Sequence, residues 1–320
     1  MPSTLIVGEV IHTNDLSSYN FTKGGLSKYN ALFGFRAVFG DGGGPDPGYS
    51  EDTLDYINIG VLSDAVDFGD PSQARTHVAS VADGVRGVWA GGRTPTFVDT
   101  IDYANILTTG DSKDFHELTQ ARRSPAGAAD GSRGLFSGGD TPPWSDRVDY
   151  ITIGTLGACT EFGGEASYAA AFKTGHSNGN RAIFTGGYSG SYSNVIEYHD
   201  IQHQTGATDI GDLTVARNAG AGLYDGNRGV VYGGDGPTDN NIDYFNMGHT
   251  GNAVDFGITP GNHNNRSTTG GVNGSRGVAA GSDSSPYDLM EYVNVGTTSN
   301  GMDFAELTKG KGNPSAVSGG

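Results

Sequence analysis

The sequence predicts an all-β fold in which one small antiparallel sheet is repeated around a ring. An apolar strand that ends in Gly or Gly-Gly recurs from Arg36, Arg86, Arg133, Arg181, Arg228 and Arg276, at intervals of 47 to 50 residues. A fixed period of this length is typical of an array of identical supersecondary units. Apolar and polar residues alternate in the strands, and Gly, Pro, Ser and Asp mark the breaks, which favours strands over helices.

Each complete repeat predicts four strands. In the third repeat they are a small-residue strand within 124–131 (SPAGAADG), then 133–139 (RGLFSGG), 147–153 (RVDYITI) and 158–162 (ACTEF). Four antiparallel strands with a period near 47 residues are typical of a β-propeller blade, whereas a leucine-rich repeat is about half as long. The 54 glycines fall at fixed places in each repeat, so we expect them in turns and not in disordered segments.

The two ends of the chain bear on the number of blades. Residues 1–28 contain the outer-strand signature Asn20-Phe21 but no Arg-Gly strand, and residues 312–320 repeat the small-residue strand. Together they predict a closing blade shared by N- and C-terminal strands, which gives seven blades of mostly four strands and no exposed sheet edge. The alternative is a ring of six blades with a loose N-terminal arm.

We expect a single domain over residues 1–320, because an array this regular overrides the two domains that the length suggests. The predicted repeats are approximately 29–75, 76–122, 123–169, 170–217, 218–263 and 264–311, with 1–28 and 312–320 completing the closing blade.

A cation follows the outermost strand of most repeats. Seven residues after the terminal apolar residue, of which Phe115 and Phe162 are examples, the chain carries Lys28, Arg75, Arg122, Arg217, His263 or Lys311, with Ala169 as the exception. The tyrosine-bearing strands carry an acid at a fixed place, as in Asp102 and Asp149. We expect these charges to pair as a ladder that stabilises the repeats.

Composition excludes several classes of function. A formal charge of −17 repels phosphate backbones, so we expect no nucleic-acid binding and assign the charge to solubility. Cys159 is the only cysteine, which excludes an intramolecular disulfide and a cysteine-based zinc site. The sequence begins with no secretory signal and has no apolar run of about 18 residues, so we expect no membrane insertion.

Catalysis is not expected either. The sequence has no GxSxG elbow and no phosphate-binding Gly-Lys-Ser/Thr, and no His recurs beside an apparent nucleophile. His199 and His203 have a spacing that chelates metals on a helix, but in a strand the two lie well apart, so we expect surface residues. We therefore expect neither a metal site nor a cofactor.

The loop between the second and third strands is the most informative surface. Equivalent positions of the six repeats hold Tyr49, Phe97, Trp144, Tyr192, Asp239 and Tyr287. Aromatics recurring on one face would suit stacking on sugars or on a protein partner. The alternative is that each aromatic packs against the neighbouring blade. Trp144, between two prolines and a serine, is the best candidate for exposure.

The elements LFSGG, VDYITI, EF and the AR at 121–122 resemble the Kelch-type propeller repeat, except that Phe or Ile210 stands where Kelch repeats usually place Trp. Residues 196–234 (IEYHDIQHQTGATDIGDLTVARNAGAGLYDGNRGVVYGG) more closely resemble the Kelch-like repeats of structural proteins of tailed, particularly marine, phages. The resemblance implies a non-enzymatic virion component, such as a tail, fibre or capsid-decoration protein, assembled in the host cytoplasm.

The implied partners are other virion proteins and a host-surface glycan or protein, and multivalent display favours a homo-oligomer. Two alternatives are a cellular Kelch-type interaction scaffold and a propeller glycosidase or lyase. The enzyme would need clustered carboxylates or a cation site on one rim. Repeat-like placement of the acids argues against it, because catalytic residues should break the repeat.

Overall fold

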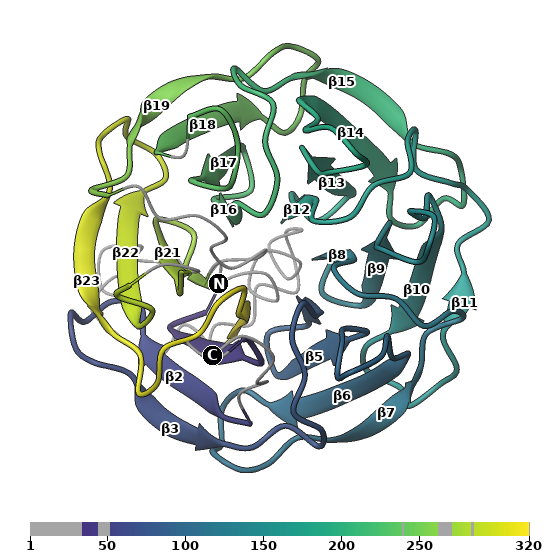
Figure 1. Cartoon of the computed structure of the whole chain (residues 1–320), viewed down its shortest axis with the longest axis horizontal. Coiled ribbons are helices and arrows are strands. Elements are labelled where there is room, and N and C mark those ends of the chain that lie inside the picture. Colours follow the sequence, from purple (N-terminus) through teal and green to yellow (C-terminus); the bar gives the residue numbers. More distant parts are fainter. Residues whose placement is uncertain (1–33, 44–51, 239, 262–270, 283–284, 320) are drawn as a thin grey trace, which may run out of the picture.

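The fold is a six-bladed β-propeller. The computed structural model describes residues 34–43, 52–238, 240–261, 271–282 and 285–319, in which six four-stranded antiparallel sheets stand around a common axis (Figure 1). No helix long and apolar enough to cross a membrane occurs in these residues. The predicted all-β propeller is therefore confirmed.

The strands of each blade run outward from the axis in the following order. Blade 1 contains β24 (Ser315–Gly319), β1 (Arg36–Gly40), β2 (Leu54–Asn58) and β3 (Val66–Gly69). Blade 2 contains β4 (Ala79–Ala82), β5 (Arg86–Ala90), β6 (Thr100–Asn105) and β7 (Lys113–Glu117). Blade 3 contains β8 (Ala126–Ala129), β9 (Arg133–Ser137), β10 (Val148–Thr152) and β11 (Thr160–Glu161).

Blade 4 contains β12 (Thr174–Ser177), β13 (Arg181–Thr185), β14 (Val195–Asp200) and β15 (Thr208–Asp212). Blade 5 contains β16 (Ala221–Tyr224), β17 (Arg228–Tyr232), β18 (Asn241–Asn246) and β19 (Val254–Ile258). Blade 6 contains β20 (Gly271–Val272), β21 (Arg276–Ala280), β22 (Leu289–Asn294) and β23 (Met302–Glu306).

The C-terminal strand closes the ring. β24 pairs antiparallel with β1, with Val317 opposite Val38, and takes the innermost place in blade 1. The prediction of seven blades is therefore wrong and the alternative of six is correct. The repeat-like C-terminus completes the first repeat, and it does not begin a seventh. The role predicted for residues 1–28 in a closing blade falls outside the described residues.

Small residues let the inner strands approach one another closely. A Cβ on Gly127 of β8 would lie 2.2 Å from the carbonyl oxygen of Ser80 in β4, and one on Gly175 would lie 2.0 Å from that of Gly127. A side chain at either glycine would therefore collide with the neighbouring backbone. A ring with few blades brings its inner strands near the axis, and the glycine content of these strands permits that spacing.

An arginine clamp joins every blade to the next. Arg133 lies with its guanidinium 4.5 Å from the ring centre of Tyr150 in its own blade, and its Nη1 donates to the Ile201 carbonyl in blade 4 at 2.9 Å. The corresponding bonds are Arg36 to Ile106, Arg86 to Ile153, Arg181 to Met247, Arg228 to Val295 and Arg276 to Ile59. The last of these runs from blade 6 to blade 1.

Aromatic pairs fill the space beneath the clamps. Phe162 is fully buried and meets the ring of Tyr150 edge-on at 6.0 Å, and Phe115 meets Tyr103 in the same way. The guanidinium, the tyrosine and the phenylalanine thus form one stack in the outer half of a blade. In blade 4 the buried Ile210 replaces the phenylalanine.

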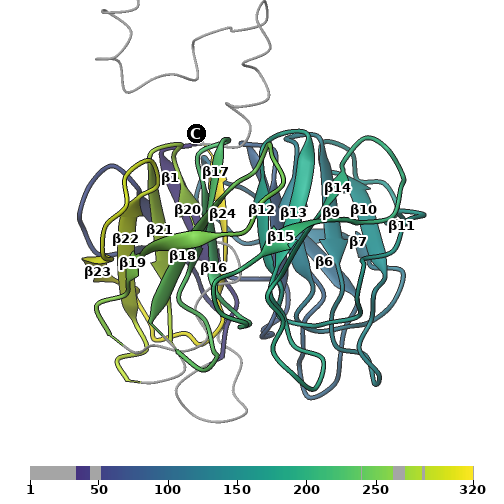
Figure 2. The same ribbon diagram turned by 90° about the horizontal axis from the view of Figure 1, so that it is seen from above.

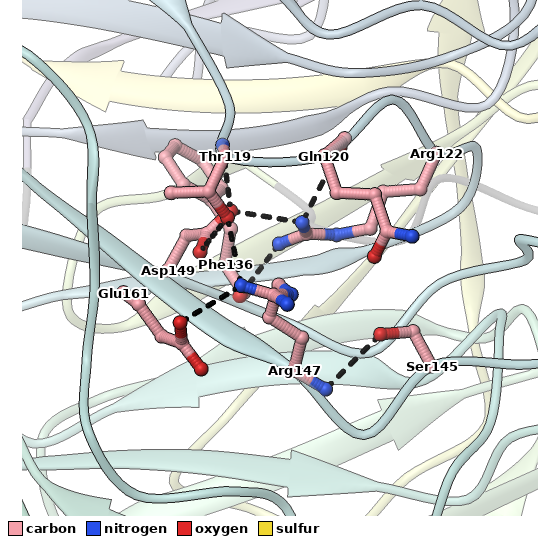
Figure 3. A network of polar contacts seen from close by, with 8 residues as sticks. All are labelled: Thr119, Gln120, Arg122, Phe136, Ser145, Arg147, Asp149 and Glu161. Atoms are coloured by element: carbon pink, nitrogen blue, oxygen red, sulfur yellow. Dashed lines mark hydrogen bonds and ion pairs between the residues drawn. The ribbon is translucent and has the colours of Figure 1, made fainter.

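In blades 1 to 5 a buried carboxylate ties the preceding connector to its blade. In blade 3, Asp149 on β10 accepts a hydrogen bond from Arg122 Nη1 at 2.8 Å and from the Thr119 hydroxyl at 2.6 Å (Figure 3). Arg122 Nη2 also donates to the Phe136 carbonyl at 3.2 Å. Arg122 and Thr119 lie between β7 and β8, so one carboxylate fixes the whole connector. The Arg122 and Asp149 side chains are both fully buried.

The expected ladder of ion pairs extends over blades 1 to 5. The other pairs are Arg75–Asp102 at 3.0 Å, Arg217–Asp243 at 3.0 Å, Lys311–Asp55 at 3.0 Å and Lys173–Glu197 at 2.7 Å. In blade 4 the cation comes from Lys173, which directly precedes β12, and not from the position of Ala169. In blade 6, Glu291 accepts a hydrogen bond from the Tyr232 hydroxyl at 2.6 Å, and His263 falls outside the described residues.

Replacing Arg122 by Ala leaves the Asp149 carboxylate buried without its cation. We expect a loss of about 3–5 kcal/mol in the free energy of unfolding, the usual result of breaking a buried pair. Arg147→Ala is the matched control, because the Arg147–Glu161 pair is partly exposed and such pairs contribute about 0–1 kcal/mol. Thermal and urea unfolding followed by circular dichroism measure both changes. Equal melting temperatures for the two variants would contradict a stabilising ladder.

Ending the chain after Gly312 removes β24 and leaves β1 as an open inner edge. We expect this chain to aggregate or to melt at a much lower temperature, because unpaired apolar strands seek other partners. Size-exclusion chromatography and calorimetry distinguish the two results. A monomeric truncated chain with the full-length melting temperature would show that β24 is not needed to close the ring.

Candidate ligand-binding face

The aromatic loops and the blade connectors leave the ring on the same face. In a blade of four antiparallel strands, the loop between the second and third strands and the connector to the next blade both lie at one end of the sheet. We call this end of the ring the loop face and the other the turn face. Figure 2 shows the strands of the blades running between the two.

On the loop face, the residue after each Gly-Gly pair forms a β-bridge with the connector. Gly138 of such a pair has φ 68°, and a Cβ there would lie 2.3 Å from the Ala170 carbonyl oxygen. The bridges are Arg93 with Thr76, Asp140 with Arg123, Tyr188 with Ala171, and Asp235 with Asn218. The backbone geometry repeats around the axis, whereas the side chains at these places differ in size and charge from one blade to the next.

A second set of variable side chains lies closer to the axis. His77, Ser124 and Phe172 occupy equivalent connector positions with φ between 54° and 62°. The N–H of Ser124 donates to the His77 carbonyl at 2.7 Å, and the N–H of Phe172 donates to the Ser124 carbonyl at 3.1 Å. Ala219 continues this backbone chain. Fixed backbone and varied side chains therefore surround the axis on this face.

The side chains of His77 and Phe172 border a cavity of about 330 Å³. The lining residues are His77, Phe172, Tyr188, Tyr192, Asn218, Asp235 and Asn313. The Tyr192 hydroxyl donates to Asp235 Oδ2 at 3.1 Å across the boundary between blades 4 and 5. Asn218 Oδ1 is buried and accepts no hydrogen bond within the part of the chain that the structure describes. The cavity thus combines aromatic walls with amide and carboxylate oxygens.

His77 contributes a neutral imidazole to this cavity. Burial, and then the nearby guanidinium groups of Arg123 and Arg93, lower its pKa to about 4. The ring of His77 meets that of Phe172 edge-on at 5.5 Å. At neutral pH this residue is therefore an aromatic wall with a polar edge and carries no charge.

Trp144 and Tyr192, both predicted as binding residues, are brought together by a third aromatic. The Tyr188 ring lies 6.1 Å from that of Trp144 in blade 3 and 5.5 Å from that of Tyr192. Trp144 and Tyr192 each keep 37% of their surface exposed. Each thus contacts a neighbouring blade and still offers surface to a ligand. Sequence reasoning missed Tyr188, although its place after Gly-Gly differs between blades, with Arg93 and Asp140 in blades 2 and 3.

The other predicted loop residues lie elsewhere on the loop face. Phe97 is half-buried and lines a second pocket, described below, while Tyr287 is half-buried beside Gly310. Tyr49 and Asp239 lie outside the described residues. We call Phe97, Trp144, Tyr188 and Tyr192, which follow one another over blades 2 to 4, the aromatic arc.

The histidine prediction needs a correction. His199 is fully buried, with its ring edge-on to Phe162 at 5.6 Å and to Phe184 at 6.2 Å, because its side of β14 faces blade 3. The expectation of a surface residue is wrong for His199, whereas His203 is exposed. Among the described residues, no three His, Cys, Asp or Glu gather in a way that could hold a metal ion.

Cys159 is a packed thiol and not a reactive one. Burial, and then the Asp149 carboxylate, raise its pKa to about 12. The thiol therefore stays protonated at neutral pH, and thiolate chemistry is not available to it.

Asp41 departs from the repeat in a way that affects stability. It occupies, with φ 52°, the position at which Gly91 and Gly138 stand in blades 2 and 3. Its side chain is fully buried, and neither carboxylate oxygen has a hydrogen-bond partner among the described residues. Burial raises its pKa to about 7, although Arg75 Nε lies 3.7 Å away and opposes this change.

No family model and no curated protein matches the chain.

The substitution Asp41→Asn removes the buried charge and keeps the size of the side chain. Asn also tolerates the positive φ of this position. Because the folded state raises the pKa, wild-type stability falls as pH rises from about 4 to about 7. We expect the variant to equal wild type near pH 4 and to melt at a higher temperature above pH 7. Calorimetry across this range measures the difference. A gain that is independent of pH would contradict the assignment to ionisation.

Proposed function

We propose that this chain is a non-catalytic binding module of a tailed-phage virion, such as a tail, fibre or capsid-decoration component. In this proposal its loop face contacts other virion proteins or a host-surface glycan or protein. The observation that carries the proposal is the gathering of non-repeating side chains on one face of a repeating scaffold.

The arginine clamps and the variable positions after Gly-Gly lie at opposite ends of the blades. The arginine clamps begin at the first residue of the second strand, next to the turn face, and are built from the same residue types in all blades. By contrast, the residues after Gly-Gly on the loop face are Arg93, Asp140, Tyr188 and Asp235 in blades 2 to 5.

The residue types on the loop face suit a sugar or a protein hot spot. Partly exposed Trp and Tyr side chains offer flat apolar surface with a polar edge, which both ligand classes exploit. The carboxylate of Asp235 and the amide of Asn218 lie in the same cavity and can accept hydrogen bonds from hydroxyl groups. We find the recognition of hydroxyl-rich surfaces the best use of this combination.

The virion assignment rests on the resemblance of the repeats to those of phage structural proteins. It carries with it assembly in the host cytoplasm and display in several copies, which raises the overall avidity of a weak site. Mass spectrometry of purified phage particles tests it directly. Peptides of this chain in stoichiometric amounts support the assignment, and their absence from particles that infect normally contradicts it.

The double substitution Trp144→Ala and Tyr192→Ala removes the exposed part of the aromatic arc. We expect binding to host cells or to a glycan array to fall at least about tenfold, the usual effect of losing two aromatic anchors. Leu156→Ala is the control, because Leu156 is 54% exposed in the turn between β10 and β11 on the turn face. Circular dichroism checks folding. Unchanged binding by the double variant would contradict the proposal, as would lost stability without lost binding.

A further inference from the structure

We propose that a pocket between blades 2 and 3 on the loop face binds a sugar ring that bears a carboxylate, as part of an acidic glycan. This inference rests on the proposed function and adds the charge of the ligand. The pocket has a volume of about 450 Å³ and is lined by Arg93, Pro95, Thr96, Phe97, Arg123 and Pro142. It adjoins the aromatic arc, because Phe97 belongs to both and Pro142 lies in the Trp144 loop.

Arg93 provides a cation without an internal partner. Its guanidinium makes no hydrogen bond, ion pair or ring contact with any residue that the structure describes, and the residue is exposed. The other described arginines bond to carbonyl or carboxylate oxygens, as Arg122 and Arg133 do. In a chain of net charge −17, a solvent-facing guanidinium that bonds to no internal acid is available to an anion from outside.

Arg123 supplies a second guanidinium, and its orientation is fixed. Its Nε donates to Asp140 Oδ2 at 2.8 Å, and its central carbon lies 5.6 Å from the ring centre of Phe97 and 5.8 Å from that of Phe172. No hydrogen bond engages its Nη nitrogens within the described ranges. A guanidinium held in this way loses little freedom when an anion binds. Asp140 offsets its charge, so Arg93 gives the pocket its net positive charge.

The walls of the pocket suit a ring and not an extended peptide. Pro95, Pro142 and Phe97 present apolar faces on which the C–H side of a sugar can pack. Extended peptides that add a strand to a sheet edge are held by main-chain hydrogen bonds. Here the backbone N–H groups of Arg93 and Arg123 already bond to Thr76 and Asp140. The groups left for a ligand are side-chain guanidinium groups and apolar faces, which match a carboxylated sugar.

The probe is an oligogalacturonate, a linear chain of sugars that each carry a carboxylate, and its control is the same oligomer fully methyl-esterified. Isothermal titration should show that wild type binds the acid form and that the affinity falls as salt rises. Arg93→Ala should weaken binding of the acid form at least about tenfold, because charge-assisted bonds are lost. Arg147→Ala changes the net charge equally but lies outside the pocket, so it should bind like wild type. The Arg93→Ala substitution should leave the fold unchanged, and so should binding of the probe. Circular dichroism checks the fold in both cases.

Several results would overturn the inference. Equal binding of the acid and the methyl ester by wild type would remove the role of charge and leave the proposed function standing. Equal losses in Arg93→Ala and Arg147→Ala would assign the effect to net charge alone. A poly-aspartate peptide that binds more tightly than the oligogalacturonate, and depends on Arg93, would assign the pocket to a peptide. The proposed function itself fails on different grounds, namely when the double variant at Trp144 and Tyr192 binds hosts normally.

Discussion

The buried bond between a connector cation and the carboxylate of the following blade is the interaction on which the loop face depends. In blade 3, Asp149 is reached by Arg122 and Thr119, which stand three residues apart on one connector. A charge pair can be buried without loss only when further hydrogen bonds satisfy both partners. The hydroxyl of Thr119 and the carbonyl of Phe136 provide such bonds, whereas Arg122 Nε is buried without a partner among the described residues. The connector is thereby fixed, and with it the residues that surround the axis.

The blades are therefore held together at both ends. Near the turn face each arginine clamp donates to a carbonyl of the next blade. Near the loop face the carboxylates of blades 1 to 5 hold the connectors that lead into their own blades. Between these two sets of contacts the inner strands touch through glycine. With its position fixed from both sides, the loop face can change its side chains without changing its backbone. Such a surface can be re-specified for a new ligand at little cost to stability.

The features that repeat in the sequence were the ones that could be predicted from it. The other repeats have the same strand order, and most have counterparts of the buried Phe162 and of the Arg122–Asp149 pair. Repetition distinguishes these features from chance. The number of blades could not be predicted in this way, because a terminal strand looks the same whether it completes the first repeat or begins another. Lys173 was not predicted because it does not stand at the sequence position of the other cations, which Ala169 occupies in this repeat. It nevertheless pairs with the equivalent carboxylate, that of Glu197.

Most residues of the candidate site were not predicted, because they stand where the repeats differ. Tyr188, His77 and Arg93 stand at positions where the repeats disagree, and a search for agreement passes over them. Only the ring geometry shows that such positions from different blades lie beside one another. Trp144 and Tyr192 were found because aromatics recur there, but the contact that joins them through Tyr188 depends on the spacing of blades 3 and 4.

The pairing of β24 with β1 also determines when the ring can be completed during synthesis. Of the described strands, β24 is made last, yet it occupies the innermost place of the blade whose other strands are made first. Blades 2 to 6 can assemble in turn as the chain leaves the ribosome, whereas blade 1 must wait until β24 has been made. Until then β1 offers an open edge to its surroundings. Of the described strands, β1 is thus the one most exposed to mispairing in a nascent chain, and β24 completes the ring only once the other blades are in place.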